Sequence, residues 1–319
     1  MNPSRAGIDR LRFFWLAGAV TAIAGSGCAR KLLISEDVVF PKNQPAELAA
    51  AVDRQTAVIF TKGVGATPVE FFVDDQKVAQ AETDKEGRAV GQGVVVEGRQ
   101  NFKSRAHLDG KWVESEGRLY AWDPAKPAIA VDIDETLSLS QYINIIWGDG
   151  LVSKPLPGSP EGVRQLAKEY QIIYWSIRPR FMYERTRKWL EKYGFPDGPM
   201  LFTDSFHAAF HQTERKRVML KELREKWPNV RIAVGDKLAD VVSCHDTGIL
   251  PVIVNPLVPK FKQHAIVVRD WNTLISRSGE FQEYLSQGSP NGDPSGRRQP
   301  KQELADVMPV GGSTNGSSH

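Results

Sequence analysis

The feature that most constrains the fold is the segment Ile129-Ala-Val-Asp-Ile-Asp-Glu-Thr-Leu-Ser138, in which an apolar run ends in two aspartates one residue apart. The run predicts a buried strand, because four apolar residues precede Asp132 and prolines mark its start. A carboxylate at the end of a buried strand needs a partner, since an unpaired buried charge is costly. Asp132 and Asp134, with Thr136 close behind, therefore indicate a metal-assisted site. The alternative is an acidic turn with Thr136 as a cap.

The length and composition are those of a globular protein with room for two domains and flanking tails. The chain has 319 residues, of which 41% are apolar and 25% are charged. Its net charge of +3 is small and forms no dense basic block, so nucleic acid is not an expected partner. The two cysteines, Cys28 and Cys244, exclude a disulfide framework and a clustered cysteine zinc site. Cys244 stands in an apolar helical segment and is expected to be buried and inert.

Residues 1–28 are predicted to be a targeting segment outside the fold. Arginines precede an apolar stretch over residues 13–24, which is shorter than the roughly 20 residues of a spanning helix. The small residues before Cys28 resemble a bacterial lipobox. This resemblance implies an exported periplasmic or cell-surface lipoprotein, anchored in the membrane through a lipidated Cys28. An ordinary secretory signal or an N-terminal anchor is the alternative.

Residues 38–122 alternate short apolar strands with glycine and aspartate-glycine turns. Strands at this regular spacing predict a small β-sandwich. The module resembles an immunoglobulin-like domain without the cysteine pair of antibody domains, and a spacer or contact role is expected. The predicted strands cover residues 56–61, 68–73, 78 onward, 93–97, 101–108 and 111–120.

From residue 126 to residue 278, strands and helices alternate. This order predicts an α/β domain with a parallel sheet, helices on both of its faces, and a site at the carboxyl ends of the strands. Residues 286–319, rich in Gly, Ser, Pro, Asn and Gln, are predicted to be a disordered tail. The predicted strands of the α/β domain end at Asp132 or cover 171–175, 231–235 and 250–254. Its predicted helices begin after the N-cap Ser159 or cover 181–193, 213–227 and 238–247.

Polar side chains follow the ends of these strands, where packing gives no reason for them. Such a set is typical of a site for a phosphate and a divalent metal, and oxygen ligands favour Mg²⁺ over zinc. The residues are Asp132, Asp134, Ser176, Arg178, Lys216, Asp236 and Asp240. Lys216 is chosen among several basic neighbours because its spacing to Leu220 fits a lysine that reaches back from a packed helix. A charged helix face is the alternative for Arg215, Arg217 and Lys221.

Four motifs, in order, resemble those of the haloacid dehalogenase-like phosphohydrolase superfamily. The resemblance covers about residues 126–256 and implies a Rossmann-like parallel sheet and a Mg²⁺-dependent phosphatase that acts on phosphomonoesters. The motifs read Asp132-Ile-Asp134-Glu-Thr136, Ser176, Lys216 and Gly235-Asp236-Lys-Leu-Ala-Asp240.

The resemblance also implies a role for each acid. Asp132 attacks phosphorus and forms an aspartyl-phosphate, while Asp134 protonates the leaving oxygen and then activates water. Mg²⁺ lies between the Asp132 carboxylate, the Asp134 carbonyl and Asp236, with Asp240 supporting it from behind.

The basic and hydroxyl residues receive roles in the same way. Ser176 and Lys216 hold the phosphoryl oxygens as charge develops on them, and Thr136 belongs to the substrate-binding set. Arg178 would contact the substrate phosphate, because a guanidinium binds phosphate in bidentate fashion.

A narrower resemblance is to the catalytic domain of lipin-type phosphatidate phosphatases. It rests on Tyr174-Trp-Ser-Ile-Arg-Pro179, Thr186-Arg-Lys-Trp-Leu190 and Gly194-Phe-Pro-Asp-Gly-Pro199. The resemblance and the tether favour phosphatidate or another lipid phosphate as substrate. Glu135 departs from the glycine usual in lipin-type domains, and Gly-Asp-Lys departs from their Gly-Asn-Arg motif. A broad-specificity secreted acid phosphatase that acts on small phosphate esters and a catalytically inert lipoprotein interaction module are the alternatives.

The segment between Thr136 and Pro160 is too short for a large cap domain, so an open site is expected. Ile145-Ile146 and Trp147 could form an apolar lip, with ordinary packing as the alternative. His207 and His211 lie four residues apart without an acidic residue between them, which favours a structural role over metal binding.

Overall fold

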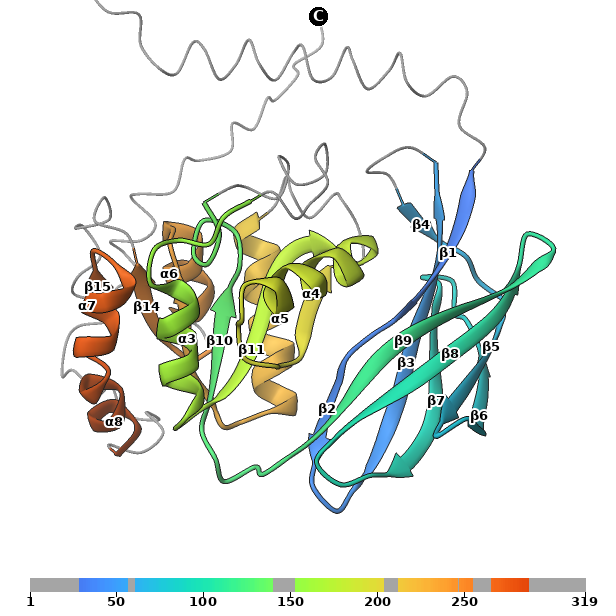
Figure 1. Cartoon of the computed structure of the whole chain (residues 1–319), viewed down its shortest axis with the longest axis horizontal. Helices are drawn as coiled ribbons and strands as arrows, with labels where there is room; N and C mark the ends of the chain where they lie inside the picture. Colours follow the sequence, from blue (N-terminus) through green and yellow to red (C-terminus); the bar gives the residue numbers. More distant parts are fainter. Residues whose placement is uncertain are drawn as a thin grey trace, which may run out of the picture.

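The computed structural model describes residues 29–56, 61–139, 153–203, 212–245, 247–254 and 265–286. Figure 1 shows a β-sandwich (blue to teal) beside a parallel sheet flanked by helices (green to orange). Several predictions fall outside the described residues. They concern the targeting segment with Cys28, strand residues 57–60, the cap and lip over 140–152, the pair His207 and His211, and the tail from residue 287.

A six-stranded sheet forms the centre of the second half of the chain, in the order β12-β11-β10-β13-β14-β15. Every neighbouring pair is parallel, which confirms the predicted α/β class. All five residues of β10 are buried, as expected for a strand covered on both faces. The strands are β10 (Ala128–Asp132), β11 (Gln171–Pro179), β12 (Met200–Thr203), β13 (Val230–Gly235), β14 (Leu250–Val254) and β15 (Ile266–Val268).

Helices cover both faces of this sheet. Ile129 and Val131 share one apolar core with α3, α4, α7 and α8, whereas Ala128 and Ala130 share the opposite core with α5 and α6. This alternation follows from the two-residue period of a strand. The helices are α3 (Ser159–Ala167), the 3₁₀ helix η1 (Arg180–Met182), α4 (Tyr183–Lys192), α5 (Gln212–Lys226), α6 (Leu238–His245), α7 (Trp271–Ser276) and α8 (Gly279–Ser286).

Two predictions about these helices are wrong in detail. Ser159 does not cap α3, because Gly158 occupies the N-cap with a φ of 79° and the Ser159 hydroxyl donates to the Leu137 carbonyl. The domain does not end at residue 278, because Phe281 of α8 is fully buried in the same core as β10.

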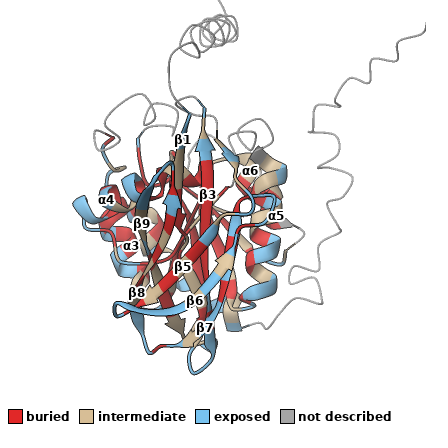
Figure 2. Cartoon of the chain, turned by 90° about the vertical axis from the view of Figure 1, so that its right-hand side faces the viewer, coloured by how far each residue is buried: buried red, intermediate tan, exposed pale blue. Residues whose placement is uncertain are grey.

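Two sheets pack face to face in the first half of the chain. One contains β1, β3, β4 and β7, and the other has the order β2-β9-β8-β5-β6. Residues from both sheets, including Leu48, Val52, Phe71 and Phe102, form one apolar core between them, and Figure 2 shows β3 buried along much of its length. The strands are β1 (Arg30–Ser35), β2 (Val38–Pro41), β3 (Pro45–Gln55), β4 (Thr61–Gly63), β5 (Pro68–Val73), β6 (Gln76–Glu82), β7 (Arg88–Val95), β8 (Arg99–Leu108) and β9 (Lys111–Trp122).

The sandwich differs from the prediction at its first strands. It begins at Arg30 and not at residue 38, because β1 pairs with β3 along six residues. The strand predicted over 93–97 instead runs from Arg88 to Val95. Apolar and polar residues do not alternate in β1, because both of its faces are covered. Leu33 enters the sandwich core, and Ile34 packs in the core of the α/β domain.

Candidate active site

Two acids follow the central strand at its carboxyl end. Asp132 is the last residue of β10 and is 2% exposed, and Asp134 is 7% exposed. The chain turns at once, because the amides of Leu137 and Ser138 both donate to the Ile133 carbonyl. This tight turn keeps both acids and Thr136 at the edge of the sheet where β11 and β13 also end.

Asp132 lies in a buried cluster with four predicted site residues. The Lys216 Nζ atom of α5 is 3.1 Å from Asp132 Oδ2 and 2.5 Å from Asp240 Oδ1, and it also lies over the Trp175 ring. The Thr136 hydroxyl is 3.4 Å from Asp132 Oδ2 and 3.2 Å from Asp236 Oδ1. Lys216 therefore links the first acid of the site to the last one.

Asp134 lies in a second cluster, formed by residues of β11 and α4. Its Oδ2 accepts hydrogen bonds from the Ser176 hydroxyl at 2.8 Å and from Arg178 Nε at 3.0 Å, and its Oδ1 accepts from Arg178 Nη2 at 2.9 Å. The guanidinium also donates from Nη1 to the Thr186 hydroxyl at 2.9 Å. Arg178 is 1% exposed, so Asp134 and Thr186 hold it in one orientation.

The residue after Asp134 adopts an unusual backbone conformation. Glu135 has a φ of 62°, in the left-handed region that glycine enters at the lowest cost. Its carboxylate forms an ion pair with Lys237, which precedes α6. The departure from the glycine of lipin-type domains therefore introduces backbone strain, together with a new contact across the site.

Burial and crowding of acids shift the pKa values in the first cluster. Burial raises the pKa of Asp132 to about 8; Lys216 opposes this shift, and the neighbouring Asp240 and Asp236 add to it. Burial likewise raises the pKa of Asp236 to about 7, against the effect of Lys237. Burial lowers the pKa of Lys216, but Asp132 and Asp240 outweigh that effect and keep the ammonium charged. An additional positive charge nearby would favour the ionised form of both acids.

The described residues of the site fit a divalent metal. Carboxylate oxygens of Asp132, Asp236 and Asp240 lie within 4.8 Å of one another, and an all-oxygen donor set suits Mg²⁺. Asp240 already uses Oδ1 for Lys216 and Oδ2 for the amides of Asp236 and Lys237. Asp132 and Asp236 are therefore better placed than Asp240 to ligate a metal directly.

The structure separates Lys216 from its basic neighbours. Lys216 is 4% exposed beside Asp132, whereas Lys221 pairs weakly with Glu225 at the surface and Arg217 pairs with Glu214. Burial also raises the pKa of the Cys244 thiol well above its usual value, consistent with the predicted buried and inert cysteine.

Two contacts of the site were not predicted from the sequence. Thr186 accepts from Arg178, and Lys237 pairs with Glu135. The signal for Thr186 was present in the Thr-Arg string, which places a hydroxyl on the buried face of α4. The sequence shows Lys237 next to Asp236, but its pairing with Glu135 depends on the course of the turn after β10. The predicted contact of Thr136 with substrate stays a prediction, because its hydroxyl lies between two acids in a fully buried position.

Among the helices that the structure describes, none has the length and apolar character needed to cross a membrane.

Comparisons with solved structures give similarities of low TM-score. A chain of the Pnkp1/Rnl/Hen1 RNA repair complex is 21% identical, with 40% of this chain covered and a TM-score of 0.35. This chain spans 42% of the length of that one. The deoxy-D-mannose-octulosonate 8-phosphate phosphatase of Haemophilus influenzae is 13% identical, with 54% and 96% of the two chains covered and a TM-score of 0.35. Titin domains Z1Z2 in a chimeric form are 12% identical, with 30% and 97% covered and a TM-score of 0.22.

A family model gives the most direct comparison. The search of curated proteins found no significant match. Residues 129–252 match the family model described as "PITM 1-3, LNS2 domain", and this range contains every predicted site residue of the α/β domain. LNS2 domains are lipin-like. The match therefore supports placing the α/β domain of this chain in the haloacid dehalogenase-like superfamily.

Proposed function

We propose that the chain is a Mg²⁺-dependent phosphomonoester hydrolase that acts through an aspartyl-phosphate on Asp132. The observation that carries the proposal is the buried cluster at the end of β10, where Asp132 lies against Lys216 and within reach of Asp236. The family match supports a phosphatase of the superfamily as the broader class. When bound between Asp132 and Asp236, Mg²⁺ would neutralise charge on the phosphoryl group.

The residues divide the reaction into two displacements. In the first, an Asp132 oxygen bonds to phosphorus as the ester P–O bond breaks, and Asp134 gives a proton to the leaving oxygen. In the second, Asp134 takes a proton from water, the water oxygen bonds to phosphorus, and the Asp132–phosphorus link breaks to release phosphate. Lys216 stabilises the negative oxygens in both steps from its place beside Asp132.

The contacts of Asp134 suggest how substrate binding prepares it for proton transfer. Both of its oxygens accept from Arg178, and one also accepts from Ser176. A phosphoryl group is a bidentate acceptor for a guanidinium and competes for the same donors. Substrate that draws Arg178 and Ser176 toward its own oxygens thereby frees Asp134 to carry the proton.

We also propose a lipid phosphate as the substrate and a membrane-anchored, exported location. The support is the lipin-like string, the family match and the lipobox-like residues before Cys28. Small soluble phosphate esters are the competing substrate class, in line with a secreted acid phosphatase.

The test is hydrolysis of an aryl phosphate by the full chain in detergent, with Mg²⁺, with a chelator, and as Asp132→Asn. Metal-dependent turnover that falls to background in the variant is expected. Turnover that survives Asp132→Asn would overturn the proposed nucleophile.

The substrate class is tested separately by phosphate release from phosphatidate in mixed micelles, against sugar and nucleotide phosphates in the same detergent. A higher kcat/KM on phosphatidate is expected. Turnover of the soluble esters alone would contradict the lipid assignment and leave the aspartyl mechanism intact.

A further inference from the structure

The β-sandwich contacts the segment that carries the active-site arginine. Arg178 ends in the site beside Asp134, and Arg180 begins η1 only two residues later. Pro179 joins them, and its ring fixes one backbone dihedral of the link. A displacement of Arg180 is therefore passed to Arg178 through very few rotatable bonds.

Arg180 is held by the sandwich. Its Nε and Nη2 atoms donate to Asp53 Oδ2 and Oδ1 at 2.8 and 2.6 Å, and Nη2 also donates to the Glu86 carbonyl at 3.1 Å. Asp53 belongs to β3 and is fully buried, and Arg180 is 6% exposed. This bidentate pair joins residues 127 positions apart in the chain. Such a fork has a fixed geometry, so it sets direction as well as distance.

The sandwich also supports Arg178 from the side of α4. Thr186 accepts from Arg178, and its neighbour Arg187 pairs with the buried Asp37 at 2.7 Å. Asp37 lies between β1 and β2, so the sandwich holds the β11–α4 connection through Arg180 and α4 itself through Arg187.

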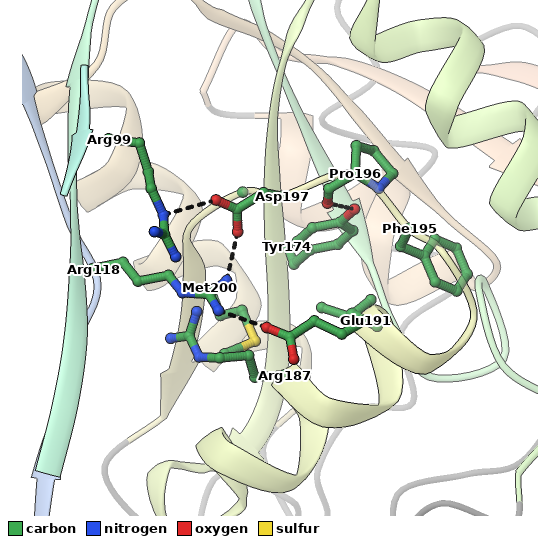
Figure 3. Close-up of a pocket in the computed structure, with 11 residues that line it drawn as sticks. Arg99, Arg118, Tyr174, Arg187, Glu191, Phe195, Pro196, Asp197 and Met200 are labelled. Atoms are coloured by element: carbon green, nitrogen blue, oxygen red, sulfur yellow. Dashed lines mark hydrogen bonds and ion pairs between the residues drawn. The ribbon is translucent and has the colours of Figure 1, made fainter. Parts of the chain in front are cut away.

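A cavity of about 200 Å³ also lies between the two domains, and no catalytic acid lines it. Figure 3 shows Arg99 and Arg118 directed toward the acids that line it. Asp197 accepts from both arginines, and Glu191 accepts from Arg118. These charges pair with one another, so we regard the cavity as a feature of the domain interface. A substitution among its residues serves as a control for a substitution at Asp53.

We propose that Asp53 is a positioning residue for the reaction, which holds Arg178 in register with Asp134 through Arg180. The inference rests on the proposed function and extends it, because it makes the sandwich a part of the catalytic unit. A spacer, by contrast, would leave the chemistry of Asp134 unaffected.

The choice of leaving group separates positioning from mere folding. An alkyl phosphate needs a proton from Asp134 as its P–O bond breaks, whereas a nitrophenyl phosphate releases a stable phenolate without one. Loss of folded protein lowers both rates by the same factor. A misplaced Arg178 cannot pass from Asp134 to the phosphoryl oxygens, so Asp134 is not freed to carry the proton and the alkyl rate falls far more.

The experiment measures kcat and KM of the full chain on both esters for the wild type, Asp53→Asn and the control Asp197→Asn. For Asp53→Asn we expect kcat on the alkyl ester to fall about 100-fold, and that on the nitrophenyl ester by about tenfold or less. Asp197→Asn weakens interface contacts in which neither Arg178 nor Arg180 takes part and is expected to leave the ratio of the two rates unchanged. Arg180→Lys keeps the charge but not the fork, and is expected to lie between wild type and Asp53→Asn.

Each outcome decides the inference. An equal loss on both esters, or no loss, in folded Asp53→Asn protein would overturn the positioning role. If Asp53→Asn does not fold, Arg180→Lys carries the test by the same ratio. The proposed function fails separately, through wild-type protein that hydrolyses neither ester or an active Asp132→Asn variant.

Discussion

Asp132 is the residue at which the competing demands of folding and chemistry meet. Burial is the largest influence on its pKa and raises it to about 8, although Lys216 lies beside it. A nucleophilic carboxylate has to be ionised, and in Asp132 that state depends on positive charge nearby. Burial alone would leave this oxygen protonated and a poor nucleophile.

The metal-free chain is expected to lose stability as the pH rises. The folded pKa of Asp132 lies above the unfolded value of 3.8, so between about pH 4 and pH 8 the folded state binds more protons and unfolding becomes easier with rising pH. Thermal unfolding in chelator across this range should show a falling midpoint. The slope should be smaller in Asp132→Asn, and a wild-type slope equal to that of the variant would contradict the assignment of this pH dependence to Asp132.

Substitution of Lys216 tests whether this side chain is the cation that stabilises the phosphoryl oxygens. Lys216→Gln removes the ammonium beside Asp132, and we expect kcat to fall about 10²- to 10³-fold, as for the loss of one donor to a developing charge. Lys221→Gln on the same helix, at a surface position, should stay within about twofold of wild type. Steady-state kinetics on an aryl phosphate compares them, and equal losses would point to the general charge of α5.

At the scale of elements, α3 and α7 pack so closely that only glycine fits at their contact. A Cβ atom added to Gly162 would lie 2.5 Å from the Trp271 ring. Trp271 in turn donates from its indole to the Thr136 carbonyl, so α7 supports the turn after β10.

Gly162→Ala is therefore expected to destabilise the chain by about 2 kcal/mol, the usual cost of overpacking. Gly279→Ala is the matched control, since Gly279 begins α8 with no atom in reach of an added Cβ. Urea unfolding should give a lower midpoint for the first variant and an unchanged or higher one for the second. A neutral Gly162→Ala would mean that the two helices separate at little cost.

The elements differ in how far the sequence reveals them. Parallel strands bring their carboxyl ends to one edge, so the acids after β10 and β13 could be placed together from the sequence alone. β3 was missed because its Ala49–Ala51 run lacks the β-branched and aromatic residues typical of strands. The contact of Asp53 with Arg180 could not be predicted, because it depends on how two domains pack. No local pattern encodes that arrangement.

At the scale of the molecule, the sandwich and the α/β domain are joined by buried charges. Asp37 accepts from Arg187, from the Arg118 amide and from the Met200 amide, and its own amide donates to the Tyr183 hydroxyl. The Tyr183 hydroxyl in turn donates to the Met200 carbonyl. The interface is thus a hydrogen-bonded network.

Asp37→Asn is expected to lower the stability of the whole chain by about 3 kcal/mol, because it leaves the largely buried Arg187 without its counter-charge. Asp123→Asn, which breaks the exposed pair with Lys42, is expected to leave the stability nearly unchanged, because solvent screens an exposed ion pair. Calorimetry or urea unfolding compares the two. Equal effects would indicate that the interface contributes little to stability.

The buried face of β3 has a consequence for biogenesis. Ala51 and Asp53 stand opposite Ile34 and Leu32 of β1, on the face that the α/β domain covers. A chain made from its N-terminus completes this sandwich before Arg180 has been synthesised. Until then this face of the sandwich is exposed to solvent, and Asp53 is hydrated there. We expect the charge of Asp53 to disfavour association of this face with other chains until Arg180 pairs with it and joins the two domains.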